Sequence, residues 1–133
     1  MNVKLFVNIP VKDLKITKAF FSSLGFSFNP QFTNDDAACL VLGNDNYFML
    51  LKKEFFEGFM KKQITDSSKY AEAIFSIMLD SRVKVDELVE KAMASGAKAS
   101  MPPMEMDGMY GRSFEDLDGH LWEVGYMDLA MVK

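Results

Sequence analysis

Apolar and polar residues alternate with a period of two in short stretches of the chain and recur with a helical period in two longer ones. The alternating stretches predict strands at residues 4–11 and 73–79. Each is followed by a helical pattern, and the side chains that share its apolar face are Thr17, Phe20, Phe21 and Leu24 in the first and Val85, Leu88, Val89 and Ala92 in the second. Gly25 and Gly96 are predicted to end these helices, because glycine readily adopts the left-handed conformation found there.

Both segments then end in a hairpin, with turns predicted at residues 43–46 and 116–119. The same order of strand, helix and hairpin indicates an internal duplication, which constrains the fold more than any single residue does. We therefore predict one domain over residues 1–133, with unit one at about 1–52, a connector at 53–72 and unit two at about 73–128. The connector is aromatic and helix-compatible in its first part, and it is a candidate cover for a cavity.

Length and charge narrow the possible functions. A chain of 133 residues suits one domain, and a net charge of −4 argues against a nucleic-acid partner, since phosphate binding needs clustered Lys and Arg. No apolar run approaches the ~20 residues that span a bilayer, so we expect no membrane insertion. Cys39 is the single cysteine and cannot form an internal disulfide, which favours a reducing, cytoplasmic location. We expect its thiol to be buried and inert.

Two longer motifs resemble a known family. Residues 7–14 (VNIPVKDL) with 20–26 (FFSSLGF) resemble the opening, and residues 110–124 (YGRSFEDLDGHLWEV) the closing hairpin, of the glyoxalase/bleomycin-resistance/dioxygenase (vicinal oxygen chelate) superfamily. The chain is similar to a branch of small bacterial proteins often labelled predicted lactoylglutathione lyases. The resemblance implies an α+β fold in which two βαβββ units form an incomplete β-barrel around a central cavity, often in a homodimer.

Members of this family that use a metal place four ligands in the cavity, one on each of four strands. The resemblance puts these positions at Phe6, near Leu50, and at Ile74 and Glu123. Only Glu123 offers a suitable donor atom, so we expect neither a metal ion nor another cofactor. Asn8 lies on the strand face of Phe6, and Ser76 on that of Ile74, where each could supply a weak oxygen contact. The candidate cavity residues are Phe6, Asn8, Leu50, Ile74, Ser76, Arg112, Leu121 and Glu123.

Glu123 allows two interpretations. By alternation it shares a strand face with Leu121 and Gly125, and in an apolar cavity it could act as a catalytic base or anchor a cationic or hydroxylated ligand. It could instead form a cross-strand pair with Arg112, which lies opposite if the hairpin turn has two residues. His120 is the only histidine and sits beside this turn, where we expect a structural role.

A methionine-rich and proline-rich loop is predicted at residues 101–109. It contains Met101, Met104, Met106 and Met109. Thioethers fill irregular apolar gaps, so these side chains could form a soft lid or a pocket wall. They could equally be buried against the barrel or a dimer partner.

Three functions remain open. The leading hypothesis is metal-independent binding of a small organic molecule, by sequestration as bleomycin-resistance relatives imply. The second is a lyase or isomerase of the lactoylglutathione-lyase type that uses Glu123 as its base or as the one retained metal ligand. The third is a protein–protein interaction module. A small-molecule ligand and a homodimer are the expected partners.

Overall fold

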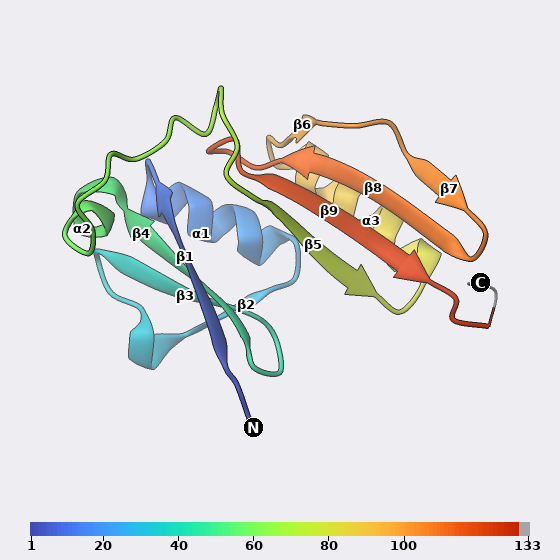
Figure 1. Ribbon diagram of the computed structural model, residues 1–133, viewed down its shortest axis with the longest axis horizontal. Coiled ribbons are helices and arrows are strands. Elements are labelled where there is room, and N and C mark those ends of the chain that lie inside the picture. Colours follow the sequence, from blue (N-terminus) through green and yellow to red (C-terminus); the bar gives the residue numbers. More distant parts are fainter. Residues whose placement is uncertain (131–133) are drawn as a thin grey trace. The chain divides into compact units, whose positions relative to one another are not determined.

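The computed structural model describes residues 1–130, which form mixed α and β structure in two compact units, Met1–Ile64 and a second beginning at Thr65 (Figure 1). The first unit contains β1 (Leu5–Val11), α1 (Leu14–Ser23), β2 (Ser27–Asn29), the 3-10 turn η1 (Pro30–Phe32), β3 (Ala37–Gly43), β4 (Asn46–Lys52) and α2 (Lys53–Glu57). The second contains β5 (Ile74–Leu79), α3 (Arg82–Ala94), β6 (Lys98–Ala99), β7 (Met104–Met106), β8 (Met109–Glu115) and β9 (Leu121–Met127). The predicted duplication of a βαβββ unit is confirmed.

The sheet of the first unit has the strand order β1-β4-β3-β2, with β1 parallel to β4 and the other neighbours antiparallel. The predicted apolar face of α1 is buried, and the helix contacts β3 and β4. Asp13 begins the helix by accepting a hydrogen bond from the Ile16 N–H at 3.1 Å, and Gly25 ends it with a φ of +100°. These local signals, all readable in the sequence, place the helix along one side of the sheet.

The sheet of the second unit has the order β5-β9-β8-β6, and β7 also pairs with β8. Helix α3 contacts β5, β8 and β9 and lies along one face of this sheet (Figure 1). Its predicted apolar face is buried, Ser81 caps its start by accepting from the Lys84 N–H at 3.1 Å, and Gly96 follows its end with a φ of +107°. The opposite face carries no helix from the described residues 65–130.

The prediction of an irregular loop at residues 101–109 is wrong in part. Strand β7 lies within it and forms a hairpin with β8 through Asp107 and Gly108. Its alternation spans only three residues, and Pro102 and Pro103 directly before it suppress the strand signal. Pairing with β8 across the two-residue turn makes this stretch a strand.

A buried carboxyl group organises the β8–β9 turn. Asp116 Oδ1 accepts from the backbone N–H groups of Asp118 and His120, both at 3.0 Å, and Oδ2 accepts from Trp122 Nε1 at 2.9 Å. On the outside of the turn, the Ser67 hydroxyl donates to the Asp118 carbonyl at 2.5 Å. The turn is therefore fixed from both sides, and it sets the register of β9, the strand that carries Glu123.

Candidate ligand-binding faces

Glu123 lies on the face of the second sheet that is turned away from α3. In the strand register Ser76, Glu123 and Ser113 stand side by side on β5, β9 and β8. Directly paired residues point to the same side of a sheet, so these three polar side chains form one row. The neighbouring row of Phe75, Trp122 and Phe114 points the other way, and Trp122 and Phe114 are buried.

This open face continues on both sides of the Glu123 row. Ile74, Leu121 and Glu115 form the adjacent row, and Ile74 is exposed. The sequence-predicted residues Ile74, Ser76, Leu121 and Glu123 are therefore brought together on one face. Glu123 is itself exposed, so its carboxylate is available to a molecule that docks here.

The predicted pair between Glu123 and Arg112 is wrong. Arg112 lies opposite Val124, on the α3 side of the sheet, where its guanidinium contacts Asp86 Oδ1 at 3.2 Å and Glu90 Oε1 at 2.8 Å. The hairpin closes through three residues rather than two, because the Asp116 N–H already donates to the His120 carbonyl at 3.0 Å. One extra residue in the turn shifts the register by one, which moves a side chain to the other face.

Arg112 belongs instead to a polar network that ties β8 to α3. The Tyr110 hydroxyl donates to Asp86 at 2.6 Å, and this hydrogen bond, with help from Arg112, holds the pKa of Asp86 below its usual range. Arg82 lies over the Tyr110 ring, 4.0 Å from its centroid, and forms an ion pair with Glu105. These contacts occupy the helix side of the sheet, so Arg112 is removed from the ligand-binding candidates.

In the first unit, Phe6 and Asn8 lie on one face of β1. Phe6 pairs with Tyr47 of β4, and the two rings stack with centroids 4.6 Å apart. Asn8 lies opposite Met49, and its amide donates to the Phe6 carbonyl at 3.3 Å. Phe6 and Asn8 are both exposed, which fits the expectation that this face of β1 is free to meet a ligand.

The predicted position of Leu50 on this face is wrong. Leu50 lies opposite Ile9 and Ala38 and is 0% exposed, so it belongs to the apolar core on the other side of the sheet. The β4 side chains that share the face of Phe6 and Asn8 are Tyr47 and Met49. Alternation identifies two faces in β4, but only the parallel register with β1 shows which of them is which.

The positions that the family resemblance assigns to metal ligands offer few donor atoms. They carry an aromatic ring at Phe6, hydrocarbons at Leu50 and Ile74, and one carboxylate at Glu123. Divalent zinc, magnesium and manganese need several nitrogen, oxygen or thiolate donors. Across residues 1–130, no three His, Cys, Asp or Glu side chains come close enough together to share a metal ion.

Cys39 and His120, the two other reactive side chains of the sequence analysis, are packed within the fold. Cys39 is fully buried, which confirms the predicted burial of its thiol, and this burial raises the thiol pKa, as expected of an unreactive cysteine. His120 is half-buried next to the Phe75 ring, with centroids 6.5 Å apart. On the open face of the second sheet the polar groups are therefore Glu123, Glu115 and the hydroxyls of Ser76 and Ser113, beside apolar side chains. None of the helices in residues 1–130 combines the length and apolar character that crossing a bilayer requires.

The chain contains two βαβββ units. Each unit has candidate ligand contacts on a face of its sheet, and this duplicated architecture defines a class of proteins. The family model for the Glyoxalase/Bleomycin resistance protein/Dioxygenase superfamily matches residues 5–124. The chain belongs to this superfamily, as the sequence motifs had indicated.

Solved structures show the same fold. A hypothetical protein of S. aureus has 26% sequence identity and a TM-score of 0.79, with 95% of each chain covered. A glyoxalase/bleomycin resistance protein/dioxygenase family enzyme from Burkholderia phytofirmans PsJN has 19% identity and a TM-score of 0.78, covering 96% of this chain and 100% of its own. The fosfomycin resistance protein FosX of Listeria monocytogenes has 18% identity and a TM-score of 0.69, with 98% of each covered. No curated protein matches the sequence.

Proposed function

We propose that this protein binds a small organic molecule on the open face of its second sheet, without a divalent metal ion. The observation that carries the proposal is the row of Ser76, Glu123 and Ser113, an exposed carboxylate between two hydroxyl groups, next to the apolar side chains of Ile74 and Leu121. Small-molecule sites commonly combine an apolar surface with a few fixed polar groups. A hydroxylated or cationic ligand with a flat apolar part matches this pattern.

The donor set supports binding without a metal. Glu123 is the one carboxylate at the four family positions, and Phe6 and Ile74 present hydrocarbon where a metal-using relative presents a ligand. Sequestration, as the bleomycin-resistance resemblance implies, requires no further chemistry from the chain.

Binding is tested with the purified protein against aromatic cations, hydroxylated metabolites and bleomycin-type antibiotics, using thermal shift followed by calorimetry. At least one compound is expected to raise the midpoint of unfolding. Glu123→Gln should then weaken binding of that compound tenfold or more, since a hydrogen bond to a charged group contributes about 1.5–3 kcal/mol. Glu87→Gln, which changes an exposed carboxylate on α3, is the matched control and should bind as the native protein does. Equal affinity of the native protein and Glu123→Gln would contradict the proposed site.

An enzymatic role for the same carboxylate is the second candidate, favoured by the exposure of Glu123 in one row with Ser76 and Ser113. As a general base it would remove a proton from a carbon next to a carbonyl in an α-oxygenated substrate. Incubation with an α-hydroxyketone in D₂O would then show deuterium uptake by nuclear magnetic resonance, and Glu123→Gln would abolish it. Exchange that persists in the variant would exclude Glu123 as the base.

A homodimer is also part of the proposal, as the family resemblance implies. Exposed apolar side chains such as Phe59 and Leu129 are suited to a contact with a second copy. Light scattering during gel filtration should give twice the chain mass at micromolar concentration. A mass of one chain over the whole concentration range would contradict this expectation.

A further inference from the structure

Five of the eleven methionines gather on one face of the second sheet, although they come from four different strands. At the β7–β8 end, Met106 pairs with Met109, which pairs in turn with Met127 of β9. Paired residues project to the same side, with Cβ atoms about 4.5–5.5 Å apart. Three thioethers therefore stand in one continuous row across three strands.

A second row lies two residues further along the same face. Met104 on β7 lies opposite Gly111 of β8, Gly111 opposite Gly125 of β9, and Gly125 opposite Met78 of β5. The two glycines leave space that the methionines fill: a Cβ added at Gly125 would lie 3.1 Å from Met78 Sδ, and one at Gly111 would lie 3.8 Å from Met104 Cε. The thioethers thus reach over the sheet rather than away from it.

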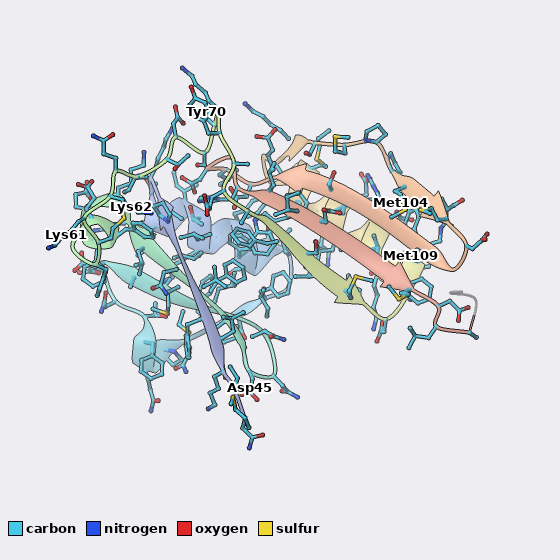
Figure 2. The ribbon with its side chains drawn as sticks, viewed as in Figure 1. Asp45, Lys61, Lys62, Tyr70, Met104 and Met109 are labelled. Atoms are coloured by element: carbon cyan, nitrogen blue, oxygen red, sulfur yellow. The ribbon has the colours of Figure 1, made fainter. Side chains whose placement is uncertain are left out.

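The face that carries both rows is the one turned away from α3. Glu105, which separates Met104 from Met106, forms an ion pair with Arg82 of α3, and Tyr110 donates its hydroxyl to Asp86 of α3. The alternate residues must therefore point to the other side. Met78, Met104 and Met106 are 54%, 40% and 66% exposed, and Figure 2 shows the side chains of Met104 and Met109 at this end of the sheet.

We propose that this methionine face binds a soft monovalent cation of the Cu(I) type. Thioether sulfur is a soft ligand that selects Cu(I) over the hard and borderline divalent ions, and it needs no deprotonation to bind. The first coordinating set is Met106, Met109 and Met127, with Met104 as the nearest additional thioether. Glu123 lies on the same face but four residues from Met127 along β9, so it is not one of the proposed ligands.

The proposed cation site differs in its donor atoms from the divalent-metal site of the family, because its donors are thioethers alone. It also does not depend on an organic ligand. Leucine or isoleucine at these positions would serve a purely apolar role equally well. The proposal therefore assigns cation binding to the sulfur atoms. The tests below therefore compare sulfur with hydrocarbon at constant side-chain size.

The experiment uses Ag(I), a redox-inert probe for Cu(I), and native protein labelled with ¹³C at the methionine methyl groups. Addition of one equivalent should shift the methyl resonances of Met106, Met109 and Met127. The resonances of Met60 and Met93, which lie outside this face, should stay in place and serve as the internal control. Shifts that are absent, or equal at Met60 and Met93, would overturn the proposal.

Affinity is then compared in a competition titration against a coloured Ag(I) or Cu(I) chelator. The triple variant Met106→Leu, Met109→Leu, Met127→Leu should lose at least tenfold in affinity, whereas Met60→Leu combined with Met93→Leu should bind like the native protein. A smaller loss in the triple variant would overturn the assignment. Should the triple variant not fold, the single change Met106→Leu at the most exposed of the three thioethers takes its place, and an unchanged affinity there would count against the proposal. Failure of the organic-ligand assay with Glu123→Gln leaves these results unaffected.

Discussion

Replacing Asp116 with alanine should destabilise the protein more than any other single change to an acidic residue of the second unit. Its carboxyl group is 5% exposed and accepts three hydrogen bonds, from the backbone N–H groups of Asp118 and His120 and from the Trp122 indole. Alanine removes the acceptor and leaves all three donors in place. The β8–β9 turn would then lose the group that holds its backbone.

The size of the effect follows from how well water can replace the carboxyl group. An unsatisfied buried donor costs about 1–3 kcal/mol. Trp122 is 1% exposed, so its N–H bears close to the full penalty, while the two backbone groups at the turn can be partly rehydrated. We expect the free energy of unfolding to fall by about 3–5 kcal/mol, a large share of the about 5–15 kcal/mol that stabilises a typical domain.

Asp116→Asn separates the hydrogen bonds from the charge. The amide oxygen can still accept the two backbone hydrogen bonds, but the amide nitrogen faces the Trp122 donor, which should cost about 1–3 kcal/mol. Burial raises the pKa of Asp116 above its ordinary value, so the folded protein holds this proton more tightly than the unfolded chain does. The resulting stability is present below the unfolded pKa and is lost as pH rises through the folded one. The deficit of Asp116→Asn relative to the native protein should therefore be largest in acid and shrink toward neutral pH.

Urea unfolding followed by circular dichroism measures both effects, at acid and neutral pH. Asp107→Ala in the β7–β8 turn is the matched control, because this exposed aspartate should contribute no more than about 0.5 kcal/mol. The reasoning would be refuted if Asp116→Ala unfolded within 1 kcal/mol of the control, or if the deficit of Asp116→Asn grew with pH.

Three further predictions address the turns, the core and the helix–strand network. Gly119→Ala should lower the melting temperature far more than Gly25→Ala: both have a positive φ, but only at Gly119 would the new Cβ lie 2.5 Å from a backbone oxygen, whereas Gly25 has open space. Leu50→Ala should cost about 2–5 kcal/mol in urea unfolding, as expected of a core side chain, and a loss under 1 kcal/mol would restore Leu50 to the ligand face. Asp86→Asn should destabilise more at neutral than at acid pH, because its hydrogen bond from Tyr110 lowers the pKa of Asp86, and stability from a lowered pKa disappears as pH falls. A pH trend like that of Asp116→Asn would contradict this explanation.

Local patterns were sufficient to predict most of the elements. The buried faces of both helices, the Asp13 cap and the glycines after the helices all depend on residues within a few positions of one another. The repeated order of elements then predicted the duplicated βαβββ fold, and the family motifs named the superfamily. The family resemblance supplied the open-face positions Phe6 and Glu123, and alternation along the strands added Asn8 and Ser76.

What the sequence could not supply is the register between strands. Arg112 and Leu50 were assigned to the ligand face, yet Arg112 faces α3 and Leu50 lies in the core. Because side chains alternate with a period of two, a shift of one residue reverses the face of every residue in a strand. The turn at Asp116 decides this shift for β9, through hydrogen bonds that no alternation pattern encodes.

The methionine face also depends partly on the local sequence and partly on the pairing of strands. The sequence by itself shows that Met101, Met104, Met106 and Met109 cluster within residues 101–109. Only the pairing of β7 with β8, and of β9 with β5 and β8, brought Met78 and Met127 into the same two rows. Local periodicity fixes what each strand can present, and contacts between residues far apart in the chain decide which side chains meet.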